Sequence, residues 1–213
     1  MGRGLPDGHR TDGRNGRADV RHLQEEGLAL TPATAADGGT APAPAHGRII
    51  TPGTEHQLGT YGLFPPSAAQ QRTVTPGAVP LTARNAEPEL LWIGFAELCS
   101  GAAARSDYRA LADRHSTWVI DGVPDPEAVS AEKAPAWRRF EEAVEALCEQ
   151  GRTLFVVGAH SLDWERATVA WQGAGIPGDA DVPEVMAGIA RRLSVLERVK
   201  SAAGAVPEGV CGS

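Results

Sequence analysis

The second half of the chain alternates between short apolar runs and longer stretches in which apolar residues recur every three or four positions. Three runs rich in β-branched, aliphatic and aromatic residues predict buried strands at Glu89–Phe95, Thr117–Asp121 and Thr153–Val157. The first strand leads into a short helix, Phe95–Cys99. We expect the third strand to be covered on both faces, because it contains almost no polar residue.

Three stretches with helical periodicity accompany these strands. The strongest covers Pro135–Gln150, with apolar residues at Trp137, Phe140, Val144, Leu147 and Cys148. Ser106 is expected to cap a helix that ends near His115, and Asp181 begins a capping-box pattern ahead of a last helix. The apolar positions of that last helix are Val185, Ile189, Leu193, Leu196 and Val199. Helices that alternate with strands predict an α/β layer structure.

The first part of the chain has a different texture. Residues 1–46 are rich in Gly, Arg, Asp, Ala, Thr and Pro without periodicity, which predicts a flexible, Gly/Pro-rich extension. Residues 47–85 contain short β-type runs broken by Pro-Gly pairs and predict a small irregular β region. The α/β region is expected at residues 86–201, followed by a tail at 202–213.

Composition excludes several classes of protein. The longest clearly apolar run, Leu154–Val157, is far shorter than the ~20 residues of a membrane span. The start of the chain has no apolar signal region, so we expect a cytoplasmic protein. Cys99, Cys148 and Cys211 are too widely spaced for a disulfide framework or a zinc ribbon. With a net charge of −7, the chain is not expected to bind nucleic acid.

The lysines exclude a phosphate-binding loop of the Walker A type. Such a loop needs a Lys directly after its glycines, to reach the β- and γ-phosphates. The chain has only Lys133 and Lys200, and neither follows a glycine-rich loop.

Among side chains that carry chemistry, the arginines are of most interest. The six histidines show no metal-ligand spacing, so we predict no metal site and no catalytic residue. Glu141, Glu142, Glu145 and Glu149 are interpreted as a solvated helical stripe. Arg138 and Arg139 lie in the first turns of the long helix, and Arg191 lies in the last helix of the chain. Their planar guanidinium groups suit phosphate or carboxylate, although surface ion pairs, such as Arg138 with Glu142, are favoured by spacing alone.

Several motifs follow one another in a fixed order between about Arg48 and Ser201. They are Trp92 with Phe95-Ala-Glu-Leu-Cys99, Ser106-Asp107-Tyr108 with Leu111-Ala112, Val123-Pro124, Arg138-Arg139-Phe140 with Val144, the strand Leu154–Val157, and Arg191 with Leu193-Ser194 and Leu196. In this order they resemble the ZapE family of cell-division ATPases, to which the mitochondrial Afg-type ATPases also belong. Asp19-Val20-Arg21 is similar to an earlier D-Y-R motif of that family.

The resemblance implies the C-terminal portion of a P-loop AAA+ ATPase. Family members carry the Walker A, Walker B and first sensor motifs upstream of the similar region. ATP and Mg are therefore the cofactors of the full-length family, and none is expected for this chain alone. The implied work is on division-ring proteins such as FtsZ, and a homo-oligomer is compatible with it. The family's S-R-L motif reads Ser194-Val195-Leu196 here, so one arginine is missing.

Two functions follow from this resemblance. The chain is either a fragment that is active only together with a nucleotide-binding core, or a nucleotide-independent protein-interaction module of the same ancestry. Arg138, Arg139 and Arg191 are the candidates for sensing nucleotide or for a subunit interface. As a fragment, the chain is expected to leave an unpaired strand edge and bare apolar helix faces.

Overall fold

The computed structural model describes residues 46–77, 79–101 and 103–200. The expected N-terminal extension up to residue 45, the Asp19-Val20-Arg21 motif, Cys211 and the tail at 202–213 lie outside the described residues. None of the helices in the described ranges has the length and apolar character needed to cross a membrane.

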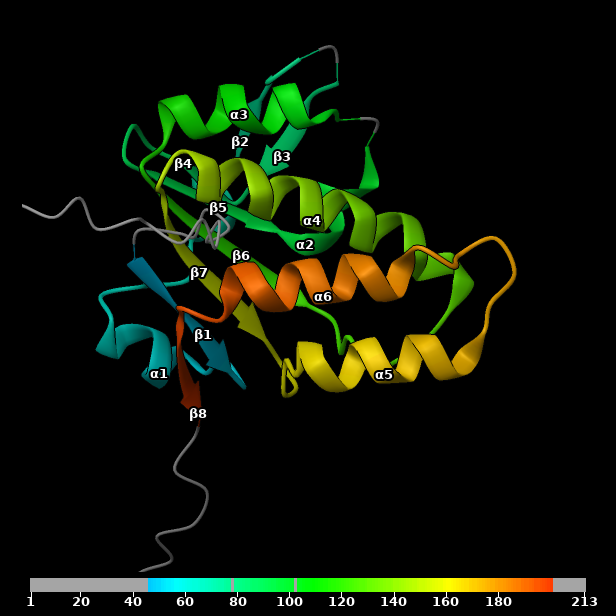
Figure 1. The fold of residues 1–213 in the computed structure, drawn as a ribbon. Helices are drawn as coiled ribbons and strands as arrows, with labels where there is room; N and C mark the ends of the chain where they lie inside the picture. Colours follow the sequence, from blue (N-terminus) through cyan, green and yellow to red (C-terminus); the bar gives the residue numbers. More distant parts are fainter. Residues whose placement is uncertain (1–45, 78, 102, 201–213) are drawn as a thin grey trace, which may run out of the picture. The chain divides into compact units, whose positions relative to one another are not determined.

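A mostly parallel sheet of six strands forms the centre of the fold (Figure 1). Its strands are β1 (His46–Thr51), β4 (Asn85–Ala86), β5 (Leu90–Gly94), β6 (Thr117–Val123), β7 (Thr153–Gly158) and β8 (Glu197–Lys200), in the spatial order β4-β5-β6-β7-β1-β8. Only β4 is antiparallel to its neighbour. A separate antiparallel pair is formed by β2 (Arg72–Val74) and β3 (Leu81–Ala83).

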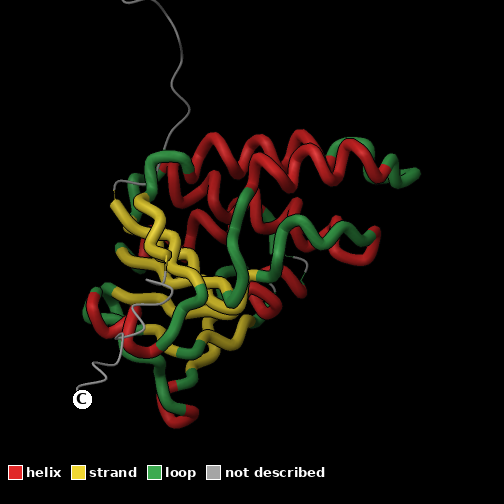
Figure 2. Tube along the Cα trace, turned by 90° about the horizontal axis from the view of Figure 1, so that it is seen from below, coloured by secondary structure: helices red, strands yellow, loops and turns green. Residues whose placement is uncertain are grey.

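The helices are distributed unequally over the two faces of this sheet. One face packs in a single apolar cluster with α2 (Phe95–Ser100), α3 (Arg105–Arg114), α4 (Ala134–Glu149), α5 (Trp164–Ala174) and α6 (Val182–Leu193). The other face packs with α1 (Glu55–Thr60) and Leu63, against Ile50, Trp92, Val119 and Val157. Figure 2 shows most helices gathered on one side of the strands.

Aromatic side chains at the start of α4 join three helices on the crowded face. The ring of Phe95 lies 5.0 Å from that of Trp137 and 5.3 Å from that of Phe140. Trp164 of α5 completes the group, with centroid distances of 5.8 Å to Trp137 and 5.9 Å to Phe140. Tilted and edge-on pairs at such separations are favourable beyond the area that they bury.

The regular elements of residues 86–201 agree closely with the predicted pattern. β5, β6, β7, α2 and α4 all lie where the apolar runs and the helical period predict them. Two elements were not predicted. Helix α5 has a weak apolar period, and β8 was interpreted as the end of the last helix. α6 instead ends at Leu193, and Val199 lies in a strand that pairs with β1.

The predicted helix caps are wrong in detail. α3 begins at Arg105, and its Asp107 carboxylate accepts a hydrogen bond of 2.9 Å from the Ala104 amide, so Ser106 is not the capping residue. Asp181 does precede α6, but its side chain makes no cap hydrogen bond because Arg138 binds it. The Asp181 cap was predicted from local spacing, which cannot show that Arg138 of another helix binds this carboxylate.

Residues 47–85 contribute more than the predicted irregular β region. β1 lies inside the main sheet, where its register pairs Arg48 with Phe155 of β7 and with Glu197 of β8. α1 follows β1, and the β2–β3 pair packs Val74 and Leu81 into the main core. A buried strand flanked by Gly and Pro has too short a pattern to be distinguished from an edge strand.

Asp121 is a buried carboxylate near the carboxyl end of β6, with only 7% of its surface exposed. Its Oδ2 atom accepts a hydrogen bond of 2.7 Å from the Trp92 indole and lies 2.9 Å from Arg84. Oδ1 is buried and has no hydrogen-bond partner within the described residues. Burial raises the pKa of Asp121, and the Trp92 and Arg84 contacts oppose that rise only in part.

We expect the free energy of unfolding to carry a pH dependence that Asp121→Asn removes. Because the native carboxyl has a raised pKa, it binds its proton more tightly than in the unfolded chain, and its stabilising contribution is lost as pH rises through the native pKa. The free energy of unfolding of the wild type relative to that of the variant should therefore fall as pH rises above the ordinary Asp pKa of about 3.9. Urea unfolding at successive pH values measures it.

Asp181→Asn is the matched control for this prediction. The hydrogen bond from Arg138 lowers the pKa of Asp181. The free energy of unfolding of the wild type relative to that of Asp181→Asn should therefore rise, not fall, with increasing pH. Parallel curves for wild type and Asp121→Asn would contradict the role given to burial.

Candidate functional site

The connection between β1 and α1 is the place where a P-loop protein would hold phosphate. The chain leaves β1 toward β5 and leaves β7 toward β8, so the carboxyl ends of β1 and β7 form a topological switch point, where α/β sheets usually bind ligands. A phosphate loop would need the eight-residue G-x-x-x-x-G-K-[ST] pattern between strand and helix. Here only Pro52, Gly53 and Thr54 separate them.

This connection is also packed too tightly to form a cradle. A Cβ atom at Gly53 would lie 2.4 Å from Val157 Cγ1, so the turn rests directly on β7. Gly53 has a φ of 71°, a conformation that favours glycine. Lys133 lies elsewhere, where its Nζ donates to the Ala128 carbonyl oxygen. The exclusion of Walker A chemistry from this connection therefore rests on geometry as well as on sequence.

Arg138 binds two carboxylates through its Nε and Nη2 atoms. Its Nε lies 2.7 Å from Asp181 Oδ2, and its Nη2 lies 2.9 Å from Asp179 Oδ1, both in or next to the loop between α5 and α6. These hydrogen bonds raise the pKa of the Arg138 guanidinium and keep it charged. The favoured ion-pair interpretation is therefore confirmed for this residue, although the partners differ from the predicted Glu142.

Arg139 and Arg191 have fewer contacts. The Nη1 atom of Arg139 donates a hydrogen bond of 3.2 Å to the Cys99 carbonyl oxygen, at the end of α2. Arg191 is exposed in the last turn of α6. Two of the three candidates, Arg138 and Arg139, line one open cavity of about 430 Å³, together with Ala104, Arg105, Pro135 and Glu142. Arg191 is not part of that lining.

The lining of the cavity beside Arg139 contains three arginines and one glutamate, Glu142. The cavity lies where α3 and α4 both begin, and helix N-termini carry partial positive charge. Arg138 and Arg105 bind carboxylates, whereas Arg139 donates a hydrogen bond to a neutral carbonyl oxygen. Arg139 is therefore the residue best able to offer unused N–H donors to a carboxylate or a phosphate.

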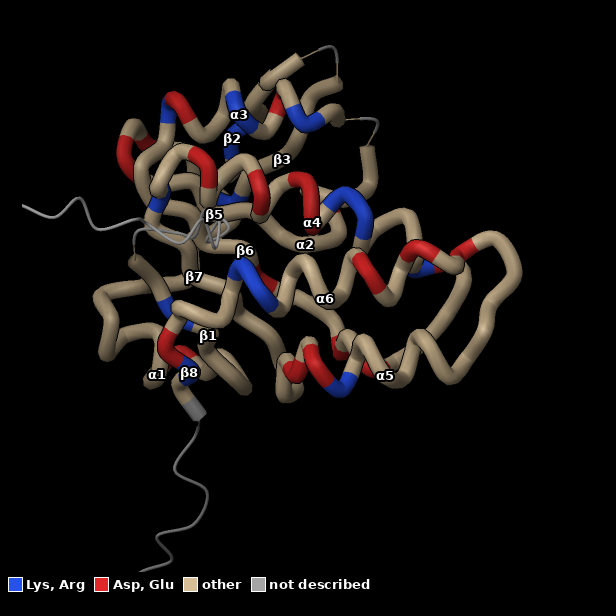
Figure 3. The backbone as a smooth tube through the Cα atoms, viewed as in Figure 1, with Lys and Arg blue, Asp and Glu red and all other residues tan. Residues whose placement is uncertain are grey.

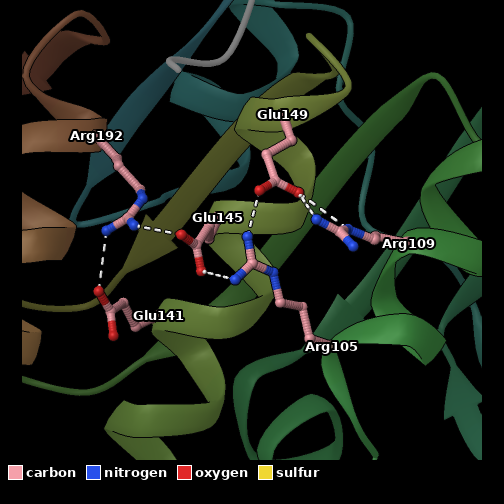
Figure 4. A network of polar contacts seen from close by, with 6 residues as sticks. All are labelled: Arg105, Arg109, Glu141, Glu145, Glu149 and Arg192. Atoms are coloured by element: carbon pink, nitrogen blue, oxygen red, sulfur yellow. Dashed lines mark hydrogen bonds and ion pairs between the residues drawn. The ribbon is translucent and has the colours of Figure 1, made fainter. Parts of the chain in front are cut away.

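The acidic stripe of α4 is the feature that sequence reasoning interpreted wrongly. Figure 3 shows acidic and basic residues along the facing sides of α3, α4 and α6. Glu141, Glu145 and Glu149 are not a solvated face, because each pairs with an arginine of a neighbouring helix (Figure 4). The sequence signal for these pairs was the presence of arginines in α3 and α6. Only the packing of these two helices against α4 shows which glutamates the arginines bind.

Glu145 joins the two halves of this network. Its Oε1 lies 2.8 Å from Arg192 Nη2 of α6, and its Oε2 lies 2.8 Å from Arg105 Nη1 of α3. Arg192 also binds Glu141, at 2.9 Å, and its side chain is only 11% exposed. Arg105 and Arg109 both bind Glu149, and the hydrogen bond from Arg109 lowers the pKa of that carboxyl.

The two thiols of the described region are packing groups, as the sequence predicts. Cys99 and Cys148 are buried and free. Burial raises the pKa of each thiol to about 12, so neither is an activated nucleophile. Within the described ranges, no group of three His, Cys, Asp or Glu side chains is placed to hold a metal ion.

Fold and sequence together define the class of this protein. A mostly parallel sheet with helices on both faces is a mixed α/β architecture consistent with a P-loop-type fold. The family model of AFG1-like ATPases matches residues 53–167, more than half of the chain, and the chain belongs to that family. The match extends from the turn after β1 into α5. Comparisons with curated proteins and with solved structures found no match.

Gly188→Ala should displace the ion pair between Arg192 of α6 and Glu141 of α4. A Cβ atom at this position would lie 2.3 Å from Glu141 Oε1 and 2.9 Å from Arg192 Nη1. Because the ion pair must move, we expect the helix-propensity gain of about 1 kcal/mol to be cancelled, with a net loss of up to about 1 kcal/mol in the free energy of unfolding. Chemical denaturation measures this loss.

Gly173→Ala in α5 is the control for Gly188→Ala. Nothing lies within 4 Å of a Cβ atom there, so the change should stabilise the protein by about 0.5–1 kcal/mol through helix propensity alone. Equal effects of the two substitutions would show that the close approach of α6 to the Glu141 carboxylate has no energetic weight.

Proposed function

We propose that this chain performs the part of an AFG1-type ATPase cycle that does not itself bind phosphate. The supporting observation is the turn after β1, which has neither the length nor the lysine of a phosphate loop, although the chain belongs to an ATPase family. In this proposal, the chain corresponds to the C-terminal portion of a ZapE-like protein, and ATP with Mg is bound by a Walker A-bearing region outside the described residues.

In the proposed role, Arg139 contacts the nucleotide-binding region. Its spare guanidinium donors line an open cavity, and Arg138 positions the same helix turn through Asp179 and Asp181. An arginine supplied to a bound nucleotide can stabilise charge that develops on the γ-phosphate. Arg191 is the second candidate, because it is exposed on a different helix and can meet a neighbouring subunit.

The client proteins in this proposal are components of the cell-division ring, such as FtsZ, in the cytoplasm. This part rests on the ordered motifs that resemble the ZapE family, above all Arg138-Arg139-Phe140 and Phe95-Ala-Glu-Leu-Cys99. Those motifs lie on α2 and α4, whose aromatic residues pack together.

A nucleotide-independent interaction module is the second candidate function. It is favoured by the completeness of the core, because the exposed large hydrophobic residues of the described region are only Phe64, Val169 and Val195. The expected bare apolar helix faces are therefore not found among the described helices. The strands at the two edges of the sheet are short, β4 having two residues and β8 the sequence Glu-Arg-Val-Lys.

We expect the purified 213-residue chain to show no ATP turnover and no binding of a fluorescent ATP analogue in the presence of Mg. It should instead increase the turnover of a separately produced Walker A-bearing region from an AFG1-like ATPase. Arg139→Ala should make that increase in turnover at least about tenfold smaller. Lys133→Ala removes a cation at the start of the same helix that does not line the cavity, and it is the control.

Two results would decide between the candidate functions. Turnover by the chain alone that follows it through size-exclusion chromatography would refute the proposal. Failure to alter the turnover of the Walker A-bearing region, with the chain folded, would favour the nucleotide-independent module.

A client role should be visible in sedimentation with FtsZ polymers assembled with GTP. We expect wild-type chain to enter the pellet with the polymers and to remain in the supernatant when FtsZ is left unassembled. Bovine serum albumin at equal concentration controls for trapping. Equal amounts of chain in both pellets would argue against FtsZ as the client.

A further inference from the structure

The face of the sheet opposite α4 holds an open groove over the amino ends of three strands. It has a volume of about 460 Å³, and its lining includes His46, Arg48, Tyr61, Phe155, Val195 and Glu197. Phe155 belongs to β7, a central strand, and yet its ring is only half buried. Side chains at the centre of a parallel sheet are normally covered on both faces. Within the described region, α1 and Leu63 cover only the neighbouring part of this face.

Next to this groove, a large aromatic side chain projects into solvent. Phe64 is 74% exposed, the highest value among the large hydrophobic residues described. The chain around it is held in place: Leu63 is buried and its amide donates to the Leu58 carbonyl, and Ser67 forms a capping box with Gln70. Because this segment is ordered before any contact forms, burying the ring costs little conformational entropy.

Groove and projecting ring lie on the same side of the molecule. Tyr61 lines the groove and is three residues from Phe64, whose ring lies over Gly59 of α1. A surface that carries a cavity and a projecting ring side by side can be complementary to itself. About a two-fold axis between them, each copy would offer the other both parts.

The charges at the rim of the groove are self-complementary as well. Arg48 Nη1 lies 2.9 Å from Glu197 Oε2, and the Arg48 guanidinium lies 5.0 Å from the centre of the Tyr61 ring. Across a two-fold axis, Arg48 of each copy can bind Glu197 of the other copy, so that no like charges are placed together. A partner of uniform charge would meet repulsion from one of them.

We propose that two copies of this chain pair through this face, with Phe64 of each copy entering the groove of the other. The ring would then contact Phe155 and Val195, which is 59% exposed and lies at the groove mouth. The dimer does not use the Arg139 cavity, and it is independent of the proposed ATPase role.

Analytical ultracentrifugation of the full chain tests this dimer. Wild type should sediment with twice the monomer mass at high concentration and dissociate on dilution. Phe64→Ala and Val195→Asp should each raise the dissociation constant at least about tenfold, because each removes two symmetric contacts. Neither changes a buried residue, so thermal unfolding at low concentration should be unaltered. Val169→Asp, an equally exposed change on α5, is the control.

A mixture of the two variants tests the reciprocal arrangement. A mixed dimer keeps one intact contact, between Phe64 of the Val195→Asp chain and the groove of the Phe64→Ala chain. The mixture should therefore dimerise more tightly than either variant alone. The proposal is overturned by a wild type that stays monomeric up to about 1 mM, by a dimer that survives both substitutions, or by one that only Phe64→Ala weakens.

Discussion

The two-sided packing of α4 is the constraint on which the rest of this structure depends. One side of the helix places Trp137 and Phe140 in the aromatic group with Phe95 and Trp164. The other sides present a line of glutamates to the arginines of α3 and α6. A helix that is apolar only along one stripe would leave its neighbours free to slide. Here the charge pairs fix the register of three helices, and directed contacts of this kind select one arrangement rather than merely adding stability.

This arrangement explains why the two adjacent arginines of α4 bind different partners. Arg138 and Arg139 are adjacent in sequence, but successive helical residues point in directions about 100° apart. One guanidinium meets the acidic residues before α6, and the other meets the end of α2. The sheet contributes differently. The contact of Gly53 with Val157 closes the switch point of the sheet. The candidate site of the described region therefore lies at the amino ends of α3 and α4 and not at the ends of the strands.

The sequence predicts elements whose pattern is long or dense, and it fails where a partner decides. α4 and the strands β5, β6 and β7 follow from periodicity and β-branched runs alone. The Ser106 cap was wrong because α3 begins one residue earlier, with Ala104 as its N-cap and Asp107 binding the Ala104 amide. The Asp181 cap was wrong because local spacing cannot show that Arg138 of another helix binds this carboxylate. The solvated interpretation of Glu145 failed for the same reason. Family resemblance located Arg138 and Arg139, and only the fold shows which of them has donors to spare.

The burial of Cys99 and Cys148 gives this domain two internal reporters. Because burial raises the pKa of both thiols to about 12, thiolate is scarce at neutral pH, and oxidants and alkylating reagents should react slowly with the folded state. Cys99 ends α2 and Cys148 lies in the last turn of α4. Each can react at a normal rate only when its helix leaves the sheet. The chemistry of these two sulfur atoms therefore records how often the helical layer opens, separately at each of its two ends.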